Sequence, residues 1–327
     1  LFGALFLLAF LVWVAAGAAL PGLSIPNLLL GTVALSATLI FGAIGGVISE
    51  RVGVVNVAIE GQMLAGAFLS AVVSSVTHSA ILGLVGAMVA GMLVSFVLAA
   101  FSIKYLVDQV IVGVVLNVFV IGLTNYLYSK VLTPNTELLN TPVNFSEIDI
   151  PLLSQIPIVG PALFRQNLIV YIMYIAVFAV WFGLFHTRWG LRLRSVGEHP
   201  QAADTVGINV ARTRFWNVSL AGAIAGLGGA FLTIGSSIAF NREMTAGDGY
   251  IALAAVIFGR WDPIRATLAA LLFGFTQNLQ YVLAGLNSPI PSDFMLMLPY
   301  VVTIFAVAGL VGQVRGPAAS GKPYVKS

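Results

Sequence analysis

Apolar runs close to the length of a membrane-crossing helix recur along this chain and limit its fold more than any other feature. A helix needs about 20 apolar residues to cross a hydrocarbon core, and polar, Pro or Gly breaks separate the runs here. They fall near 1–20, 27–49, 61–77, 80–103, 109–129, 167–187, 215–239, 249–259, 266–285 and 294–313. The sequence therefore predicts an all-α, polytopic membrane protein of about ten transmembrane helices in a single domain, 1–327. The runs at 61–77 and 249–259 are short for a span, which predicts tilted or broken helices.

The composition agrees with a membrane protein and argues against several other classes. Of the 327 residues 59% are hydrophobic and 8% are charged, with a mean hydropathy of +1.00, too apolar for a soluble domain. The basic residues gather in a few loops, so we expect no nucleic-acid partner. Cysteine is absent and the three histidines lack ligand spacing, so we expect no metal site. The sequence has no G-x-x-x-x-G-K-[ST] loop, so this chain is not expected to hydrolyse ATP.

Arginine and lysine set the expected orientation. The loop 188–214 carries five arginines and the tail 314–327 is also basic, so both are predicted to be cytoplasmic. The Pro-rich loop 130–166 is one crossing away from the arginine loop and is predicted to be extracytoplasmic. Counting ten crossings back places the N-terminus in the cytoplasm. The first run ends in a stretch like a signal-peptide cleavage region, but no basic segment precedes it, so we expect a spanning helix.

The stretch "ERVGVVNVAIEG" places charges and an asparagine between two apolar runs. Asn56 and Glu60 are four residues apart and would share a helical face, whereas the valines and glycines favour a broken or extended backbone. One interpretation is a solvated cytoplasmic turn. The other, which we favour, is a break between two helices over 56–61, with Glu60 facing protein or a water-filled cavity, because a carboxylate facing lipid is costly.

A second stretch echoes the first. "ERVGVVNVAIEGQMLAGAF" and "NREMTAGDGYIALAAVIFG" both run from an adjacent Arg and Glu to an acidic residue and glycine, then into an apolar helix. The acidic steps are Glu60-Gly61 and Asp248-Gly249. The crossing count gives the two copies opposite directions, which is the pattern of an inverted repeat. Chance similarity between two short motifs remains the alternative.

Amides inside the spans are the other candidate polar groups. Asn117 and Asn125 belong to one run, and Gln277 and Asn278 to another. They could meet a polar solute, or they could form hydrogen bonds between helices.

In the arginine loop, "GEHPQAADTVGI" predicts a short amphipathic helix over 201–206 after a proline. Such a loop suits docking on a soluble partner; an inert linker is the alternative.

Three motifs in order, "SERVGVVNVAIEGQMLAGAF", "VGEHPQAADTVGINV" and "MTAGDGYIALAAVIFGRWDP", give the chain a family resemblance. It resembles the permease subunits of bacterial ABC importers in the branched-chain amino acid and ribose permease superfamily. The nearest resemblance is to the nucleoside branch linked to basic membrane lipoproteins. This implies a ten-helix fold similar to that of the vitamin B12 importer, in the bacterial cytoplasmic (inner) membrane.

The resemblance also implies partners. Two permease subunits, identical or different, would enclose the pathway. An ABC ATPase subunit would carry ATP and Mg at the cytoplasmic face, an extracytoplasmic substrate-binding protein would deliver the solute, and membrane lipid would surround the chain, which itself binds no cofactor. A permease for a sugar or branched-chain amino acid, and an ion-coupled secondary transporter, are the alternatives; an intramembrane enzyme lacks a nucleophile and base pair.

Two groups of residues are the candidate functional positions. The loop before the seventh helix carries the coupling helix in that family, and the family's N-x-x-x-E-G segment is matched by Asn56, Glu60 and Gly61. No catalytic or metal site is expected. The substrate-pathway candidates are Asn56, Glu60, Gly61, Asn117, Asp248 and Gln277. The candidates for coupling to the ATPase are Gly197, Glu198, Ala202, Ala203, Gly207 and Ile208.

Overall fold

The computed structural model describes residues 25–157, 159–236, 239–285 and 316–325, together with Met297 and Val301. The predicted run at 1–20 lies outside these residues, as does nearly all of 294–313. The longer helices follow the other predicted runs closely. They are α2 (Ile25–Arg51), α3 (Ile59–Thr77), α4 (Ala80–Ala99), α5 (Gln109–Leu127), α8 (Leu168–His186), α11 (Val210–Ala230), α12 (Asp248–Phe258) and α13 (Pro263–Gly285).

Six helical segments of the described residues are long and apolar enough to cross a membrane. Three of them continue past an α-helix into π-helical turns, named η1 (Ala100–Lys104), η2 (Tyr128–Leu132) and η4 (Phe231–Gly235). A further apolar helix, α12, is shorter. The chain is therefore a mostly helical, multi-pass membrane protein. The count of ten helices stays a prediction.

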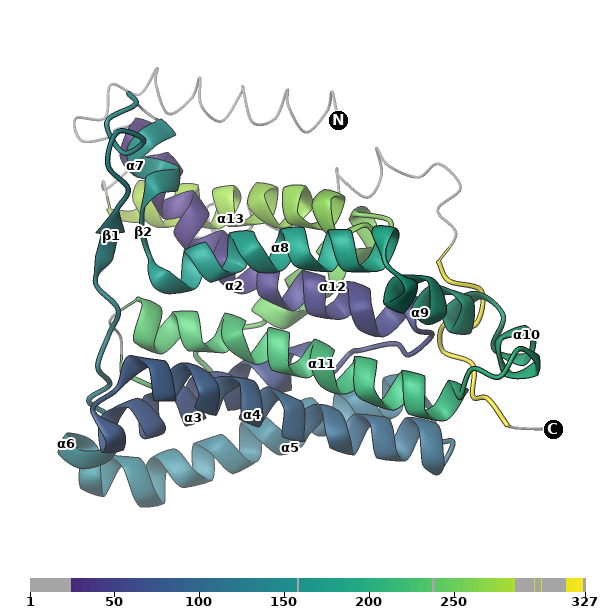
Figure 1. Ribbon diagram of the computed structural model, residues 1–327. Coiled ribbons are helices and arrows are strands. Elements are labelled where there is room, and N and C mark those ends of the chain that lie inside the picture. Colours follow the sequence, from purple (N-terminus) through teal and green to yellow (C-terminus); the bar gives the residue numbers. More distant parts are fainter. Residues whose placement is uncertain are drawn as a thin grey trace.

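Two helices form the centre of the bundle. Of the residues in the most apolar part of each helix, 72% are buried in α2 and 78% in α11, but only 28% in α8. Helix α11 packs along α4, α2 and α3, and α2 also packs along α13 (Figure 1). Gly226 of α11 lies so close to α4 that a β-carbon there would overlap the carbonyl of Ala87. Small residues let membrane helices approach in this way.

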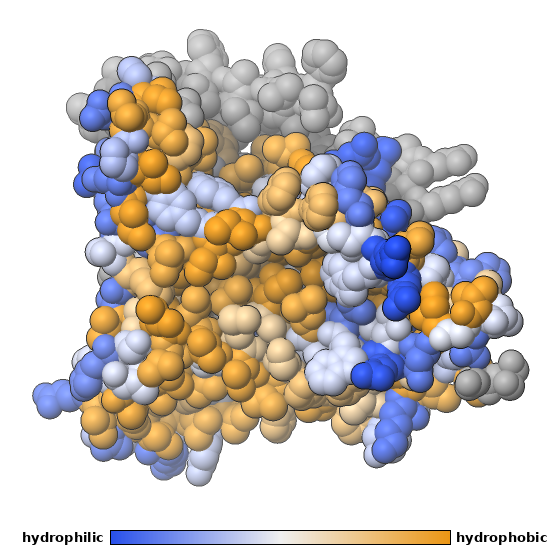
Figure 2. All heavy atoms as spheres, in the orientation of Figure 1, coloured by the Kyte–Doolittle hydropathy of each residue, from blue (hydrophilic) through white to orange (hydrophobic). Residues whose placement is uncertain are grey.

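The segments that connect the helices gather at opposite ends of the bundle (Figure 1). One end, called the arginine end, carries α9 (Arg188–Glu198), α10 (Pro200–Thr205) and the tail 316–325. The other, called the loop end, carries η3 (Thr133–Asn135), α6 (Thr136–Leu139) and α7 (Val159–Phe164). Helix α10 confirms the short helix that the sequence predicts after Pro200. Figure 2 shows that apolar side chains dominate the surface between the two ends.

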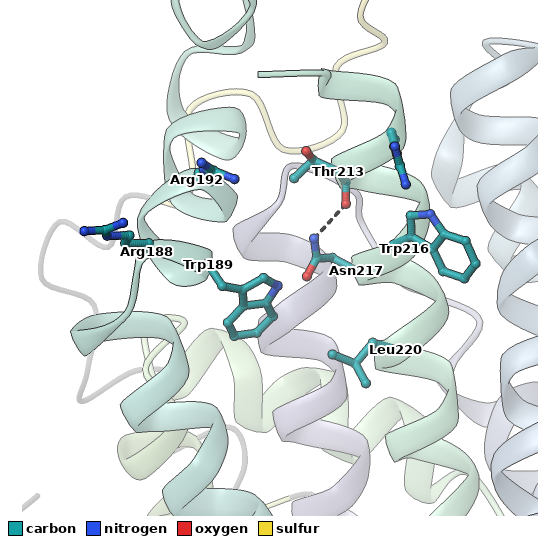
Figure 3. Close-up of a pocket in the computed structure, with 8 residues that line it drawn as sticks. Arg188, Trp189, Arg192, Thr213, Trp216, Asn217 and Leu220 are labelled. Carbon is teal, nitrogen blue, oxygen red and sulfur yellow. Dashed lines mark hydrogen bonds between the residues drawn. The ribbon is translucent and has the colours of Figure 1, made fainter. Parts of the chain in front are cut away.

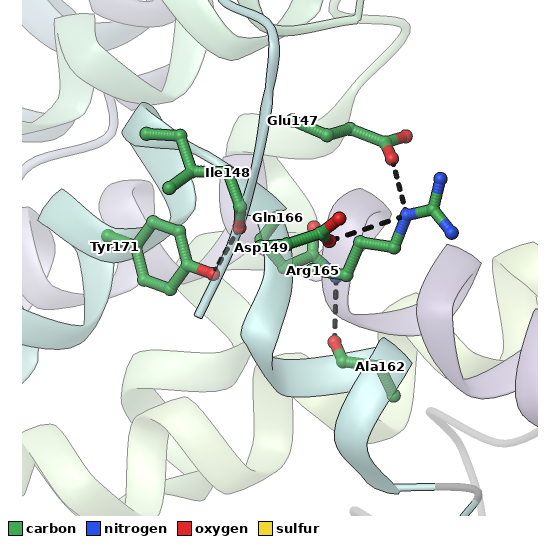
Figure 4. A network of polar contacts seen from close by, with 7 residues as sticks. All are labelled: Glu147, Ile148, Asp149, Ala162, Arg165, Gln166 and Tyr171. Atoms are coloured by element: carbon green, nitrogen blue, oxygen red, sulfur yellow. Dashed lines mark hydrogen bonds and ion pairs between the residues drawn. The ribbon is translucent and has the colours of Figure 1, made fainter. Parts of the chain in front are cut away.

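A two-stranded ribbon at the loop end departs from the all-α prediction. Strand β1 (Glu147–Asp149) pairs antiparallel with β2 (Arg165–Asn167). Arg165 Nε lies 2.9 Å from Glu147 Oε2 and 3.6 Å from Asp149 Oδ1 (Figure 4). The hydrogen bond and charge of Glu147 raise the pKa of Arg165. The strands are three residues each and lack the alternation that marks a strand in sequence, so no pattern announced them.

Candidate functional site

The polar stretch between α2 and α3 is a buried break in the helices. The break covers 52–58, whereas the sequence predicted 56–61. It begins earlier because Gly53 turns the chain away from α2 with a φ of +90°, a conformation that favours glycine. Asn56 lies in the break, but Glu60 and Gly61 belong to the first turn of α3. Four side chains of the break have no exposed surface: Val52, Val54, Asn56 and Ala58.

Several freed backbone groups of the break are paired within the protein, as is expected of a break inside a membrane. The Ser49 hydroxyl donates to the Val54 carbonyl at 2.9 Å, and the Val55 amide donates to Gln109 Oε1 at 2.7 Å. The Asn56 side chain exchanges two hydrogen bonds of 3.0 Å with the amide of Gln62. In a solvated turn these groups would bond to water, so the described residues favour a buried break whose polar groups bond to the protein.

Glu60 binds the N-terminal end of α12. Its carboxylate accepts from the Thr245 hydroxyl at 2.6 Å, the Gly247 amide at 3.0 Å and the Gly249 amide at 2.7 Å. Only 4% of Glu60 is exposed. The first amides of a helix have no partner within it, and the helix dipole favours a negative charge there. A β-carbon on Gly249 would overlap the backbone of Glu60, so glycine permits this contact.

Arg51 binds the opposite end of α12. Its Nε donates to the Trp261 carbonyl at 2.8 Å, and its Nη2 lies 3.4 Å from the Arg260 carbonyl. Both acceptor residues follow the last turn of α12 and have positive φ values, 53° for Arg260 and 56° for Trp261. A cation at a helix C-terminus complements the dipole. The neighbouring Glu50 accepts from the Trp261 indole at 2.5 Å, so one Glu-Arg pair holds one turn.

Helix α12 reaches only part of the way through a membrane. Its 11 residues give a length of about 16 Å, against roughly 30 Å for a hydrocarbon core. Its C-terminal end is held by Arg51 at the arginine end of the bundle. Its N-terminal end, with Glu60, therefore lies deep between the two ends of the bundle.

Asn117 joins α5 to the same cluster. Its Oδ1 accepts from the Gly61 amide at 2.9 Å, and its Nδ2 donates to the Val57 carbonyl at 2.9 Å. The same Nδ2 lies 3.1 Å from the Tyr250 hydroxyl of α12. Asn117 is 1% exposed, so it connects the break, α3, α5 and α12 from a buried position.

Asp248 and Gln277 form a second, less buried pair. Gln277 of α13 donates to Asp248 Oδ1 at 2.9 Å, and both residues keep some exposed surface. Two tyrosines in the same region are well exposed, Tyr250 at 47% and Tyr281 at 61%. Asn278 instead braces two helices, since its Nδ2 donates to the Leu28 carbonyl at 2.6 Å.

The coupling candidates divide between an exposed and a buried set. Glu198, Ala202 and Gly207 are exposed and Ile208 is half-buried, whereas Gly197 is buried and Ala203 is 3% exposed. A cleft of about 360 Å³ lies between α9 and α10 and includes Val206, which is 76% exposed. Val206 is not among the residues predicted from the sequence, where an apolar residue at the end of a short polar helix was the available signal.

Gly197 connects the coupling helices α9 and α10 to the end of α2. A β-carbon on Gly197 would overlap the carbonyl of Arg51, so α9 lies directly on the end of α2. The tail reinforces the contact, because the Ala319 amide donates to the Gly197 carbonyl at 2.9 Å. Arg214 Nη1 donates to the Lys322 carbonyl at 3.0 Å and so holds the tail to α11.

Comparison with known proteins assigns the family. Residues 28–307 match the family described as branched-chain amino acid transport system / permease component. The chain therefore belongs to this family of membrane permease components and is a transport subunit. No solved structure matches it.

Curated relatives cover nearly the whole chain. The guanosine ABC transporter permease protein NupQ of Bacillus subtilis is 41% identical over 90% of this chain and 95% of its own length. The nucleoside ABC transporter permease protein NupC of Lactococcus lactis is 41% identical over 89% of this chain and 94% of its own. The putative glucose ABC transporter permease protein TsgC13 of Haloferax volcanii is 34% identical over 85% and 89%. A second guanosine permease protein of Bacillus subtilis, NupP, is 26% identical over 83% and 79%.

Proposed function

We propose that this chain is one permease subunit of an ATP-driven importer for nucleosides in the bacterial cytoplasmic membrane. The observation that carries the substrate is the 41% identity, over about nine tenths of the chain, to permease proteins named for guanosine and for nucleosides. Two different permease proteins named for guanosine transport in Bacillus subtilis are both similar to this chain. We therefore also propose a second, homologous permease as its partner.

The two ends of the bundle take opposite sides of the membrane in this proposal. The arginine end faces the cytoplasm, because short loops rich in arginine stay on that side. The loop end then faces the extracytoplasmic substrate-binding protein. The opposite placement of the two sets of loops (Figure 1) supports this assignment.

The exposed residues of α10 would dock on the ATPase. Val206, with 76% of its surface exposed, and the adjacent cleft of about 360 Å³ supply an apolar contact. A movement of α9 and α10 would reach the end of α2 through the contact of Gly197 with Arg51. Arg51 holds the turn after α12, so the same movement would shift α12, which is a hypothesis that coupling measurements must test.

The solute would pass along the exposed side of α12 and α13. Gln277 and Asp248 offer an amide and a carboxylate, and Tyr250 and Tyr281 offer exposed rings. Aromatic rings stack on nucleobases, and the amide and carboxylate can bond to ribose hydroxyls or base edges. In contrast, four other candidates form their hydrogen bonds within the protein and would brace the pathway: Glu60, Gly61, Asn56 and Asn117.

The complete complex, reconstituted with its binding protein, tests the substrate. Guanosine or adenosine should stimulate ATP hydrolysis and drive uptake into vesicles, while ribose, glucose and leucine should do neither. If a sugar or leucine stimulated ATP hydrolysis and nucleosides did not, that compound would be the substrate instead of a nucleoside. Uptake that follows an ion gradient in the absence of ATP would replace the mechanism by secondary transport.

A further inference from the structure

A cleft with three arginines lies between α9 and α11, and shares Arg192 with the cleft between α9 and α10. It has a volume of about 490 Å³ (Figure 3). Arg188 and Arg192 line it from α9, and Arg212 from the first turn of α11. Figure 3 shows the cleft opening between these two helices, with the ring of Trp189 lying toward its centre.

The three guanidinium groups have no partner within the described part of the chain. No hydrogen bond or ion pair occupies the side chains of Arg188, Arg192 or Arg212. Other arginines at this end are engaged: Arg194 lies over the Phe185 ring at 5.1 Å, and Arg214 donates to the tail. Three unpaired cations around one cleft favour a ligand with a compact negative charge.

The rest of the lining is aromatic and apolar. Trp189 and Trp216 are 37% and 56% exposed, and Leu220, one turn further into α11, is 39% exposed. In α8, the helix that precedes α9, Phe178 and Phe182 are 63% and 46% exposed. Arg212, Trp216 and Leu220 follow one another at four-residue spacing, so the order along α11 is cation, tryptophan, then aliphatic group. This is the order of a headgroup, an interface and acyl chains.

The depth of the cleft fits the edge of a membrane. Arg188 is two residues past the span of α8, which ends at His186, and Arg212 is the third residue of the span of α11, which begins at Val210. A soluble anion would need the arginines alone, and a soluble protein would not need the apolar surface to continue along the span. Basic pockets at the ends of membrane helices bind anionic lipid headgroups.

We propose that this cleft binds the phosphate headgroup of an anionic phospholipid, with its acyl chains lying along the exposed face of α8 and α11. The arginines contact the phosphate, the tryptophans contact the glycerol region and Leu220 contacts the chains. The site is independent of the transported solute and rests only on the chain being embedded in a membrane.

Lipid binding to the purified complex tests the site. We would titrate phosphatidylglycerol, cardiolipin, phosphatidylcholine and inorganic phosphate separately, and follow bound lipid by native mass spectrometry and the melting temperature. We expect the two anionic lipids to bind and to raise the melting temperature, with phosphatidylcholine and phosphate doing neither. Replacing Arg188, Arg192 and Arg212 together by Gln should weaken anionic lipid binding by about tenfold or more.

The matched control removes three exposed cations elsewhere, by Lys104→Gln, Lys130→Gln and Arg265→Gln, and should bind lipid like the unaltered protein. If the triple arginine variant does not fold, the salt dependence of the unaltered protein still decides, because added NaCl should abolish the preference for phosphatidylglycerol over phosphatidylcholine. Equal binding of phosphatidylglycerol and phosphatidylcholine, or an effect of inorganic phosphate equal to that of the anionic lipids, would overturn the proposal. It would also be overturned if the triple arginine variant no longer bound the ATPase but still bound anionic lipid.

Discussion

Arg51 and Glu60 hold opposite ends of the same short helix. The guanidinium of Arg51 donates to the Trp261 carbonyl after the last turn of α12, and the carboxylate of Glu60 accepts the Gly249 amide in its first turn. Both charges have the sign that the helix dipole favours at that end. One stretch of sequence therefore fixes the position of a helix that is too short to cross the membrane.

Glu60→Gln should destabilise the subunit and reduce transport. A carboxamide keeps one acceptor oxygen but turns an NH₂ donor toward groups that are themselves donors, where the carboxylate now accepts three hydrogen bonds. We expect a loss of about 2 kcal/mol in stability, measured by thermal unfolding of the purified complex. Glu137→Gln, at an exposed position of the loop end, is the control. An unchanged melting temperature in Glu60→Gln would show that the charge does not hold α12.

Arg51→Gln should uncouple ATP hydrolysis from transport. The shorter side chain cannot reach both the Arg260 and Trp261 carbonyls, so the end of α12 loses its link to α2. We expect substrate-stimulated ATP hydrolysis to persist while uptake per ATP falls several-fold. Arg265→Gln removes an exposed arginine from the first turn of α13 and should keep the ratio. Normal uptake per ATP in Arg51→Gln contradicts the coupling path.

Gly197→Ala should weaken the contact between α9 and α2. A methyl group there overlaps the Arg51 carbonyl, so the helix must move or the contact must open. Overpacking of this kind costs typically about 1–3 kcal/mol. Gly122→Ala in α5 is the control, since a β-carbon at Gly122 meets nothing within 4 Å. Thermal unfolding and ATPase stimulation compare the two variants, and equal behaviour would remove Gly197 from the coupling path.

Val206→Arg should prevent the ATPase from binding. Its side chain is 76% exposed beside the cleft of α10, so the change adds bulk and charge to the docking surface without disturbing the core. Ala203→Arg is a poorer test, because Ala203 is 3% exposed and the change would damage α10 itself. Val325→Arg, 68% exposed on the tail, is the control. Co-purification of the ATPase is the measurement, and full recovery with Val206→Arg would move the docking surface elsewhere.

Tyr281→Ala should raise the nucleoside concentration needed for half-maximal uptake. Stacking of a base on an aromatic ring is worth about 1–3 kcal/mol, which is about 5-fold to 150-fold in affinity. Tyr281→Phe keeps the ring and should behave like the unaltered protein. Tyr105→Ala removes an equally exposed tyrosine, 62%, next to η1, and should have no effect. Equal uptake curves for Tyr281→Ala and the unaltered chain would exclude stacking at this position.

The sequence alone determined the membrane class, most helix positions and the family. The run at 27–49 became α2 (Ile25–Arg51) and the run at 80–103 became α4 with η1, because apolar length and periodicity are local properties that any folded form must satisfy. The charged stretch around Glu60 was recognisable as unusual for the same reason: charges inside an apolar region need partners.

Only the tertiary structure decided which partners those charges have. Thr245 is 185 residues from Glu60 and Trp261 is 210 residues from Arg51 along the chain, and no local pattern specifies pairings across such distances. The inward position of Ala203 and the contact of Gly197 with Arg51 likewise depend on how α9 and α10 lie against α2. A sequence shows that a buried charge must be compensated, because desolvation is costly everywhere, but the packing of distant helices selects the compensating group.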